Sequence, residues 1–183
     1  MKKALLVFII AMLNFATSFA QSYPVVAGVE FGSTYENCKR VLDKRFNNGK
    51  VSYQSTPNQI EYYNIEFGGE HFDYCMFYFQ NDVNRTFLSC IQFVSRFALD
   101  EIQHAKDKRD RIYIAYLEKY PLRWQNKDED GFLYYVLGHN PLNEENGFVV
   151  ISAFKDKTKA GNMKYWTKIS YGPVDFVKPI DEI

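Results

Sequence analysis

One stretch, residues 60–97, constrains the fold of this chain more than any other. It alternates apolar and polar residues and is interrupted by two short polar segments, at positions 68–71 and 81–84. It also contains eleven of the thirty phenylalanine and tyrosine residues of the chain. Alternation bounded by turn residues predicts three antiparallel strands joined as hairpins, at 60–67, 72–80 and 87–97. We therefore expect the hydrophobic core in this stretch.

The first twenty residues have the pattern of an export signal. Lys2 and Lys3 precede an unbroken apolar run at 4–13, and the segment ends in small residues at Ser18 and Ala20. This pattern predicts a secretory signal peptide over residues 1–20, cleaved after Ala20, and a periplasmic or secreted mature chain. The apolar run is shorter than the roughly 20 residues of a membrane-spanning helix, so a retained anchor is not expected.

Charge and length limit which classes of protein the mature chain, 21–183, can belong to. Without Lys2 and Lys3, 20 of the 22 basic residues remain against 22 acidic ones, and no basic stripe occurs. Nucleic acid is therefore not expected as a partner, and no mature segment is apolar enough to span a membrane. The length suits a single domain, or two similar halves at 28–97 and 98–176 that share a core.

Two helices are expected from periodicity and capping signals. The first begins at Ser33, which forms a capping box with Glu36, and ends at the polar residues 47–49. The second covers 98–120 and ends before Pro121. Within it, the mixed charges of 106–111 predict a solvated face.

The last third of the chain again has a strand pattern. Apolar segments at 131–138, 147–155 and 163–171 are separated by polar loops. The chain therefore reads helix, strands, helix, strands, with connections too short for parallel crossovers. We predict an α+β fold in which two helices pack on one face of an antiparallel sheet, and a degenerate duplication of a helix-plus-meander unit is one way to reach it.

The start of the first helix carries a resemblance. Gly28, Gly32, Ser33 and Glu36, followed by the pair at 41–42, resemble the opening of small exported bacterial domains of the β-lactamase-inhibitor-protein type. The segment is also similar to outer-membrane assembly lipoproteins, although it lacks their lipidated cysteine. The layout resembles small exported proteins of the Bacteroides group, which implies no activity. The first two resemblances imply helices on one sheet face and protein partners on the other.

The turns predict which residues share a face of the central strands. A turn at Gly69-Glu70 places Ile65 opposite Tyr74, and a second turn centred after Asp82 places Cys75 opposite Cys90. The core face then holds Tyr63, Ile65, Phe67, Phe72, Tyr74, Met76, Phe87, Ile91 and Phe93. The second face holds Tyr62, Asn64, Glu66, Asp73, Cys75, Phe77, Leu88, Cys90, Gln92 and Val94.

The second face is amphipathic and is the candidate binding surface. Alternatively, the other half of the chain or the loop after Tyr120 covers it. The predicted binding residues are Tyr62, Asn64, Glu66, Asp73, Phe77 and Gln92.

The chain has three cysteines, of which Cys38 is expected to be a buried thiol. In an oxidising compartment, the predicted pairing of Cys75 with Cys90 permits a disulfide. Two buried thiols are the alternative.

Catalytic and metal signatures are not apparent. His71, Asp73 and Cys75 share one strand face, but His71 and Cys75 would lie about 13 Å apart at the rise of an extended strand. No nucleophile elbow, phosphate loop or dinucleotide fingerprint occurs, so neither a cofactor nor a metal is expected. We therefore expect a non-enzymatic binding protein of the bacterial envelope that engages a protein or another envelope component. The alternatives are a small envelope hydrolase, whose carboxylates the sequence does not identify, and a structural component.

Overall fold

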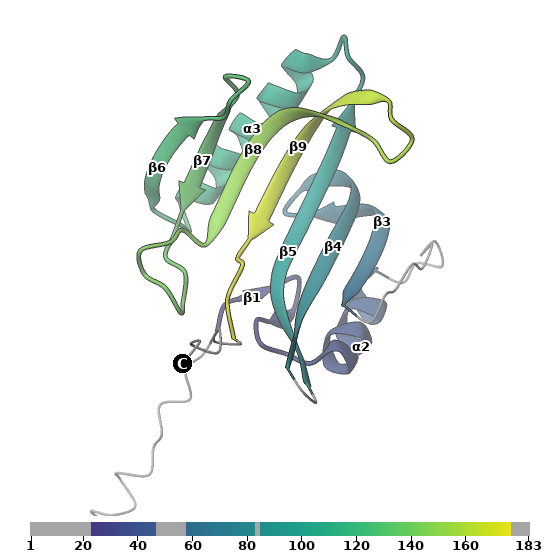
Figure 1. Cartoon of the computed structure of the whole chain (residues 1–183), viewed down its shortest axis with the longest axis vertical. Coiled ribbons are helices and arrows are strands. Elements are labelled where there is room, and N and C mark those ends of the chain that lie inside the picture. Colours follow the sequence, from purple (N-terminus) through teal and green to yellow (C-terminus); the bar gives the residue numbers. More distant parts are fainter. Residues whose placement is uncertain (1–22, 47–57, 83–84, 177–183) are drawn as a thin grey trace, which may run out of the picture.

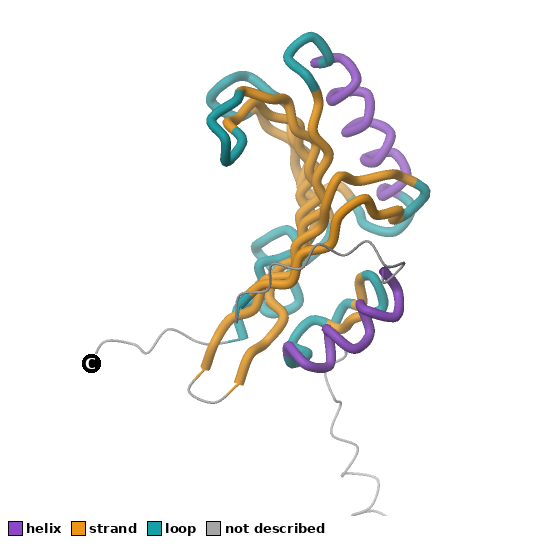
Figure 2. Tube along the Cα trace, turned by 90° about the vertical axis from the view of Figure 1, so that its right-hand side faces the viewer, coloured by secondary structure: helices purple, strands orange, loops and turns teal. Residues whose placement is uncertain are grey.

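The computed structural model of the chain describes residues 23–46, 58–82 and 85–176. In this part, two helices pack on the same side of a curved antiparallel sheet (Figures 1 and 2). The helices are α2 (Tyr35–Phe46) and α3 (Ile102–Leu117). The sheet strands are β3 (Gln59–Phe67), β4 (Glu70–Asp82), β5 (Arg85–Phe97), β6 (Leu122–Lys127), β7 (Leu133–Leu137), β8 (Val149–Lys157) and β9 (Met163–Tyr171). The predicted α+β class is confirmed.

The sheet joins two meanders at their last strands. The strand order is β3-β4-β5-β9-β8-β7-β6, and every pairing is antiparallel. Each meander follows a helix in the sequence, so the helix-plus-meander order occurs twice. A duplication of the chain stays a prediction. Strand β6 was not expected from the sequence, and it forms an exposed edge of the sheet.

A small hairpin precedes α2 and ties it to the sheet. Its strands are β1 (Val25–Val26) and β2 (Val29–Glu30), joined through Ala27 and Gly28 at positive φ. The backbone N–H of Gly32 then donates to the carbonyl of Leu88 in β5 at 2.9 Å. The N-cap of α2 is Thr34 and not Ser33: the Thr34 hydroxyl accepts from the N–H of Asn37 at 3.4 Å. The helix therefore begins one residue later than the capping box predicted.

The predicted solvated face of the second helix is wrong. Lys108 and Arg109 are both buried, at 7% and 5% exposure. The ammonium of Lys108 donates to the carbonyl of His71 and lies 4.5 Å from the centre of the Phe72 ring. The guanidinium of Arg109 donates to the carbonyl of Leu133 at 3.0 Å. The sheet curves toward α3 at this point, so these two long side chains cross the interface and meet backbone acceptors that the helix pattern does not reveal.

The first hairpin turns one residue earlier than predicted. Gly68 and Gly69 form the turn, both at positive φ, so Ile65 pairs with Phe72. Asn64 also has a positive φ of 52°, and the ladder skips it between the pairs of Tyr63 and Ile65. Because of this irregularity, the side chains before and after Asn64 do not follow one uninterrupted alternation.

The second hairpin has a different register from the predicted one. This difference moves side chains to the face of the sheet opposite to the predicted one. Cys75 pairs with Phe93, and Cys90 pairs with Tyr78 next to a bulge at Tyr78–Phe79. The observed register differs by an odd number of residues, so Cys75 and Cys90 point to opposite faces. The predicted disulfide is therefore wrong: all three cysteines are free, with Cys38 and Cys75 buried.

The core lies between the sheet and the two helices. Its centre is Phe93, whose ring stacks on Phe67 with centroids 4.1 Å apart and contacts Phe72, Phe77 and Tyr171. Neither described helix is long and apolar enough to cross a membrane. The predicted signal peptide, 1–20, and the end of the first predicted helix at 47–49 lie outside the described residues.

Candidate functional site

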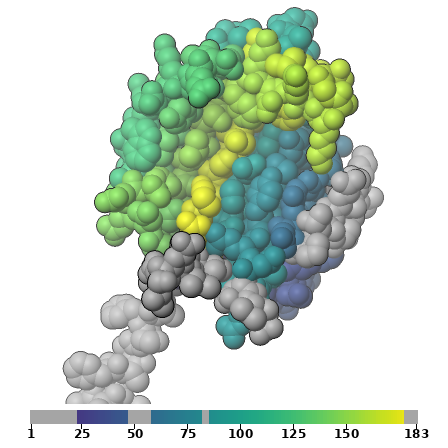
Figure 3. Space-filling model, in the orientation of Figure 1, coloured from purple at the N-terminus to yellow at the C-terminus, as the bar shows by residue number. Residues whose placement is uncertain are grey.

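One face of the sheet is not covered by either of the helices that the structure describes. Thr167 of β9 donates its hydroxyl to the carbonyl of Ala105 in α3 at 2.7 Å, so it faces the helices. Its neighbours Trp166 and Lys168 therefore point to the opposite face. On that side the connection between β8 and β9 curves over the sheet, as Figures 1 and 2 show. In Figure 3 this hairpin stands yellow-green against the teal surface of β4 and β5.

Beneath the hairpin, the uncovered face contains two adjoining hollows of about 360 and 300 Å³. They share Tyr74, Met76, Lys159 and Trp166, so we treat them as one site and call it the sheet-face groove. The lining residues are Glu61, Tyr63, Tyr74, Met76, Gln92, Val94, Arg96, Phe154, Asp156, Lys157, Thr158, Lys159, Ala160, Trp166 and Lys168. Strands β3, β4, β5 and β9 form the floor, while β8 and the connection between β8 and β9 form the opposite wall and the overhang.

Aromatic rings in contact run along the groove. The ring centroids of Tyr63 and Tyr74 lie 6.1 Å apart, and Tyr74 meets Trp166 edge-on at 6.4 Å. Trp166 in turn lies parallel to Phe154, with centroids 6.3 Å apart. The indole N–H of Trp166 donates to the carbonyl of Asp156 at 3.2 Å, which holds the ring in place. Aromatic contacts of this kind are worth about 0.5–1.5 kcal/mol each and give the groove a defined wall.

One carboxylate and one cation of the groove are held in place by neighbouring groups. Glu61 accepts hydrogen bonds from the hydroxyl of Tyr63, at 2.6 Å, and from the amide of Gln59. The guanidinium of Arg96 lies 5.5 Å from the Tyr74 ring and 3.7 Å from Asp73. The backbone N–H of Arg96 also donates to Asp73, at 2.6 Å. These contacts fix the charged groups before any ligand arrives.

Lys168 differs from the other cations because it is partly buried in the groove. Its ammonium lies 5.1 Å from the centre of the Phe154 ring. Burial lowers the pKa of Lys168, with smaller opposing effects from Cys90 and Asp156. Among the described residues, no carboxylate forms an ion pair with it. Its charge is therefore desolvated without direct compensation.

The cysteine and tyrosines in and beside the groove favour binding over nucleophilic chemistry. Burial raises the pKa of Cys90 to about 11, only partly offset by Lys168, so the thiol stays protonated at neutral pH. Burial also raises the pKa of Tyr74 and of Tyr78 to about 12. Among the described residues, no group of three or more histidine, cysteine, aspartate or glutamate side chains is placed to hold a metal ion.

The structure does not bring the predicted binding residues together on one surface. Tyr62 and Phe77 are completely buried under α2 and belong to the core, because the register and the break at Asn64 turn them inward. Asn64 and Glu66 are exposed and line a separate hollow beside Arg45.

Only two predicted residues lie at or beside the groove. Gln92 lines it, and Asp73 supports Arg96 from its edge. Tyr63, Tyr74 and Met76, which were assigned to the core face, line the groove instead.

Sequence reasoning missed the half of the groove that β8 and β9 supply. Trp166 and Lys168 alternate with Thr167 and Ile169, so the strand pattern of 163–171 did contain their shared face. What the pattern lacked was the pairing of β9 with β5, which brings residues 70 positions apart to one surface. No local signal specifies that pairing.

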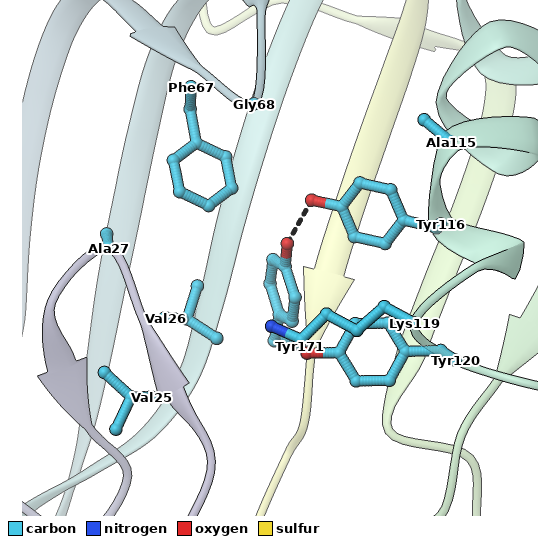
Figure 4. A pocket seen from close by; sticks show the side chains of 10 residues that line it. All are labelled: Val25, Val26, Ala27, Phe67, Gly68, Ala115, Tyr116, Lys119, Tyr120 and Tyr171. Carbon is cyan, nitrogen blue, oxygen red and sulfur yellow. Dashed lines mark hydrogen bonds between the residues drawn. The ribbon is translucent and has the colours of Figure 1, made fainter.

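A second cavity of about 280 Å³ lies on the helix side, between the β1–β2 hairpin and α3 (Figure 4). Val25, Val26 and Phe67 line it on one side, and Tyr116 and Tyr120 on the other. The hydroxyls of Tyr116 and Tyr171 hydrogen-bond to each other across it. Because these two hydroxyls are hydrogen-bonded to each other, we interpret the cavity as a gap in the packing between the β1–β2 hairpin and α3.

Comparison of the chain with protein-family models, curated proteins and solved structures found no match. The resemblance to domains of the β-lactamase-inhibitor-protein type therefore stays a prediction. A function for this chain has to be argued from the groove.

Proposed function

We propose that the chain is an exported, non-enzymatic binding protein of the bacterial envelope, and that the sheet-face groove is its binding site. The observation that carries the proposal is a concave, aromatic-lined surface on the sheet face that neither described helix covers. Concave sites with aromatic walls and a few placed polar groups are the usual form of a ligand site. The export signal at 1–20 supports the location.

The fixed geometry of the groove supports binding in particular. Tyr63 and Trp166 each donate a side-chain hydrogen bond within the protein, and the guanidinium of Arg96 lies 3.7 Å from Asp73. A wall ordered in advance loses little conformational entropy when a ligand binds, which increases affinity. A purely structural envelope component would have no need of such a wall.

The alternative of an envelope hydrolase has weaker support. Of the two carboxylates in the groove, Glu61 is tied to Gln59 and Tyr63 through both oxygens. Asp156 accepts a hydrogen bond from the backbone N–H of Lys157 at 2.6 Å, so both carboxylates already have donors within the protein. Binding therefore accounts for more of the observations than hydrolysis does.

Tryptophan fluorescence tests the proposal directly. The chain has two tryptophans, and Trp124→Phe leaves Trp166 in the groove as the only one. This protein would be titrated with neutral oligosaccharides, acidic oligosaccharides, acidic and basic peptides, and phosphatidylglycerol vesicles. We expect at least one of these probes to change the Trp166 emission and to bind at least tenfold more weakly to Tyr74→Ala.

Tyr134→Ala serves as the matched control, because Tyr134 alternates onto the same sheet face but does not line the groove. It should bind like the parent protein. Equal weakening by Tyr74→Ala and Tyr134→Ala, or failure of every probe to bind, would overturn the groove as a binding site.

A further inference from the structure

The sheet-face groove has an excess of positive charge. Four cations line it, Arg96, Lys157, Lys159 and Lys168, against the two carboxylates Glu61 and Asp156. The whole chain, in contrast, has 22 basic and 22 acidic residues. The positive charge is thus a property of this site and not of the protein surface in general, and such a site attracts anionic ligands.

Lys168 supplies the strongest reason for an anionic ligand. It lies in the floor among Val94, Phe154 and Trp166, and no carboxylate among the described residues pairs with it. Asp156 acts on it only at longer range. A partly buried, unpaired charge is costly, and an anion at hydrogen-bond distance would offset that cost.

Arg96 lies in the same floor, in β5, and Lys159 lies in the overhang. The planar guanidinium of Arg96 is held over the Tyr74 ring, an arrangement that leaves an edge for a carboxylate. Lys159 stands in the overhanging hairpin and has no ion pair with a described residue. The cations are therefore spread along the groove, which suits a ligand that carries charge at more than one point.

The floor also limits the kind of chain that can bind. The backbone groups of β4, β5 and β9 are engaged in the ladders of the sheet. A peptide cannot add here as an extra strand, because that mode needs a free sheet edge. Recognition must come from side chains alone: ring faces, the amide of Gln92, the hydroxyl of Thr158 and the cations. A ligand whose rings carry hydroxyl and carboxylate groups can interact with each of these side chains.

We propose that the sheet-face groove binds an acidic oligosaccharide, whose carboxylates contact Lys168 and Arg96 and whose sugar rings lie against Tyr74 and Trp166. This inference rests on the proposed binding function of the groove. It adds the ligand class and the two residues that select it.

Calorimetric titration of the full mature chain tests the ligand class. The probes are oligogalacturonate, oligomannuronate and hyaluronan oligomers of six sugar units, and the fully methyl-esterified oligogalacturonate as the neutral counterpart. We expect at least one acidic probe to bind, and its affinity to fall steeply as salt concentration rises. The ester should bind at least tenfold more weakly than the acid.

Variants test the residues. Lys168→Met keeps the apolar stem and removes the charge, and it should weaken binding of the acid about tenfold to a hundredfold, as expected for a charged hydrogen bond. Lys168→Arg should restore most of the affinity. The control is Lys155→Met: Lys155 is in the same hairpin but alternates onto the other sheet face, so binding should not change. Circular dichroism verifies that each variant is folded.

Several results would overturn the inference. They are equal affinity for the acid and the ester, no effect of Lys168→Met in a folded protein, and tighter binding of a hexaglutamate peptide than of every acidic oligosaccharide. Absence of binding by all three acidic probes would also overturn it. If a neutral oligosaccharide binds and Tyr74→Ala abolishes that binding, the proposed function stands while the acidic ligand class fails.

Discussion

Tyr62 and Tyr63 are neighbours in β3 with opposite surroundings, and truncating each should have opposite consequences. Tyr62 is completely buried, and its hydroxyl donates to Asp43 of α2 at 2.9 Å. Its ring lies 5.4 Å from Phe46 and 6.3 Å from Phe77, measured between centroids. Tyr63 is half-buried and lines the groove.

The cost of Tyr62→Ala follows from these contacts. Removing a buried ring costs about 3–5 kcal/mol, and losing a hydrogen bond to a charged acceptor costs about 1.5–3 kcal/mol. The sum is comparable to the whole stability of a small domain, about 5–15 kcal/mol, so Tyr62→Ala should be largely unfolded or only marginally folded. Tyr62→Phe should lose only the hydrogen-bond part.

Urea unfolding, followed by circular dichroism, measures the free energy of unfolding of the Tyr62 and Tyr63 variants. Tyr63→Ala should cost about 1–2 kcal/mol, because it removes a half-buried ring and one surface hydrogen bond. In the fluorescence titration, Tyr63→Ala should weaken ligand binding while Tyr62→Phe leaves it unchanged. If Tyr63→Ala destabilises the fold as much as Tyr62→Ala, the two faces of β3 are assigned wrongly and the groove argument fails with them.

Three further predictions concern thiols, a glycine and pH. Mass spectrometry of the folded chain with and without reductant should show three free thiols, with Cys38 and Cys75 unreactive toward maleimide until the protein unfolds. Gly172→Ala should cost about 1–3 kcal/mol in urea unfolding, because its Cβ would lie 2.5 Å from the carbonyl O of Ser89 at a φ of +82°; an unchanged midpoint would contradict this close approach. Burial lowers the pKa of Lys168 below 10.5, so the unfolded chain holds the extra proton between the two values and stability rises with pH there. Wild type should therefore gain stability relative to Lys168→Met as pH is raised toward 10.5, and a constant difference would refute it.

Periodicity and turn residues were enough for the element types and the α+β class. The strands at 60–67, 72–80 and 87–97, the two helices and the last three strands are all present, with shifted ends. These features depend on local alternation and on backbone preferences of glycine and proline, which a sequence displays directly. Strand β6 was missed because its polar, exposed residues lack the apolar alternation of a packed strand.

The faces of the central sheet were harder to predict, because one residue of register exchanges them. The bulge at Tyr78–Phe79 and the left-handed Asn64 each shift the alternation, and neither has a distinctive sequence signal. The disulfide and the choice of Tyr62 and Phe77 as binding residues failed for this reason. The pairing of β9 with β5, which completes the groove, depends on long-range packing that no local pattern encodes.

The groove takes its lining residues from both meanders, and in the sheet these two parts of the chain are joined through the pairing of β5 with β9. A bound molecule would therefore contact both meanders and hold them together. Its binding free energy would add to the work needed to pull the two meanders apart, whether by heat, by denaturant or by force along the chain. In an envelope protein, such a ligand would make resistance to unfolding depend on whether the site is occupied. The ligand-bound form would therefore persist longer than the ligand-free form.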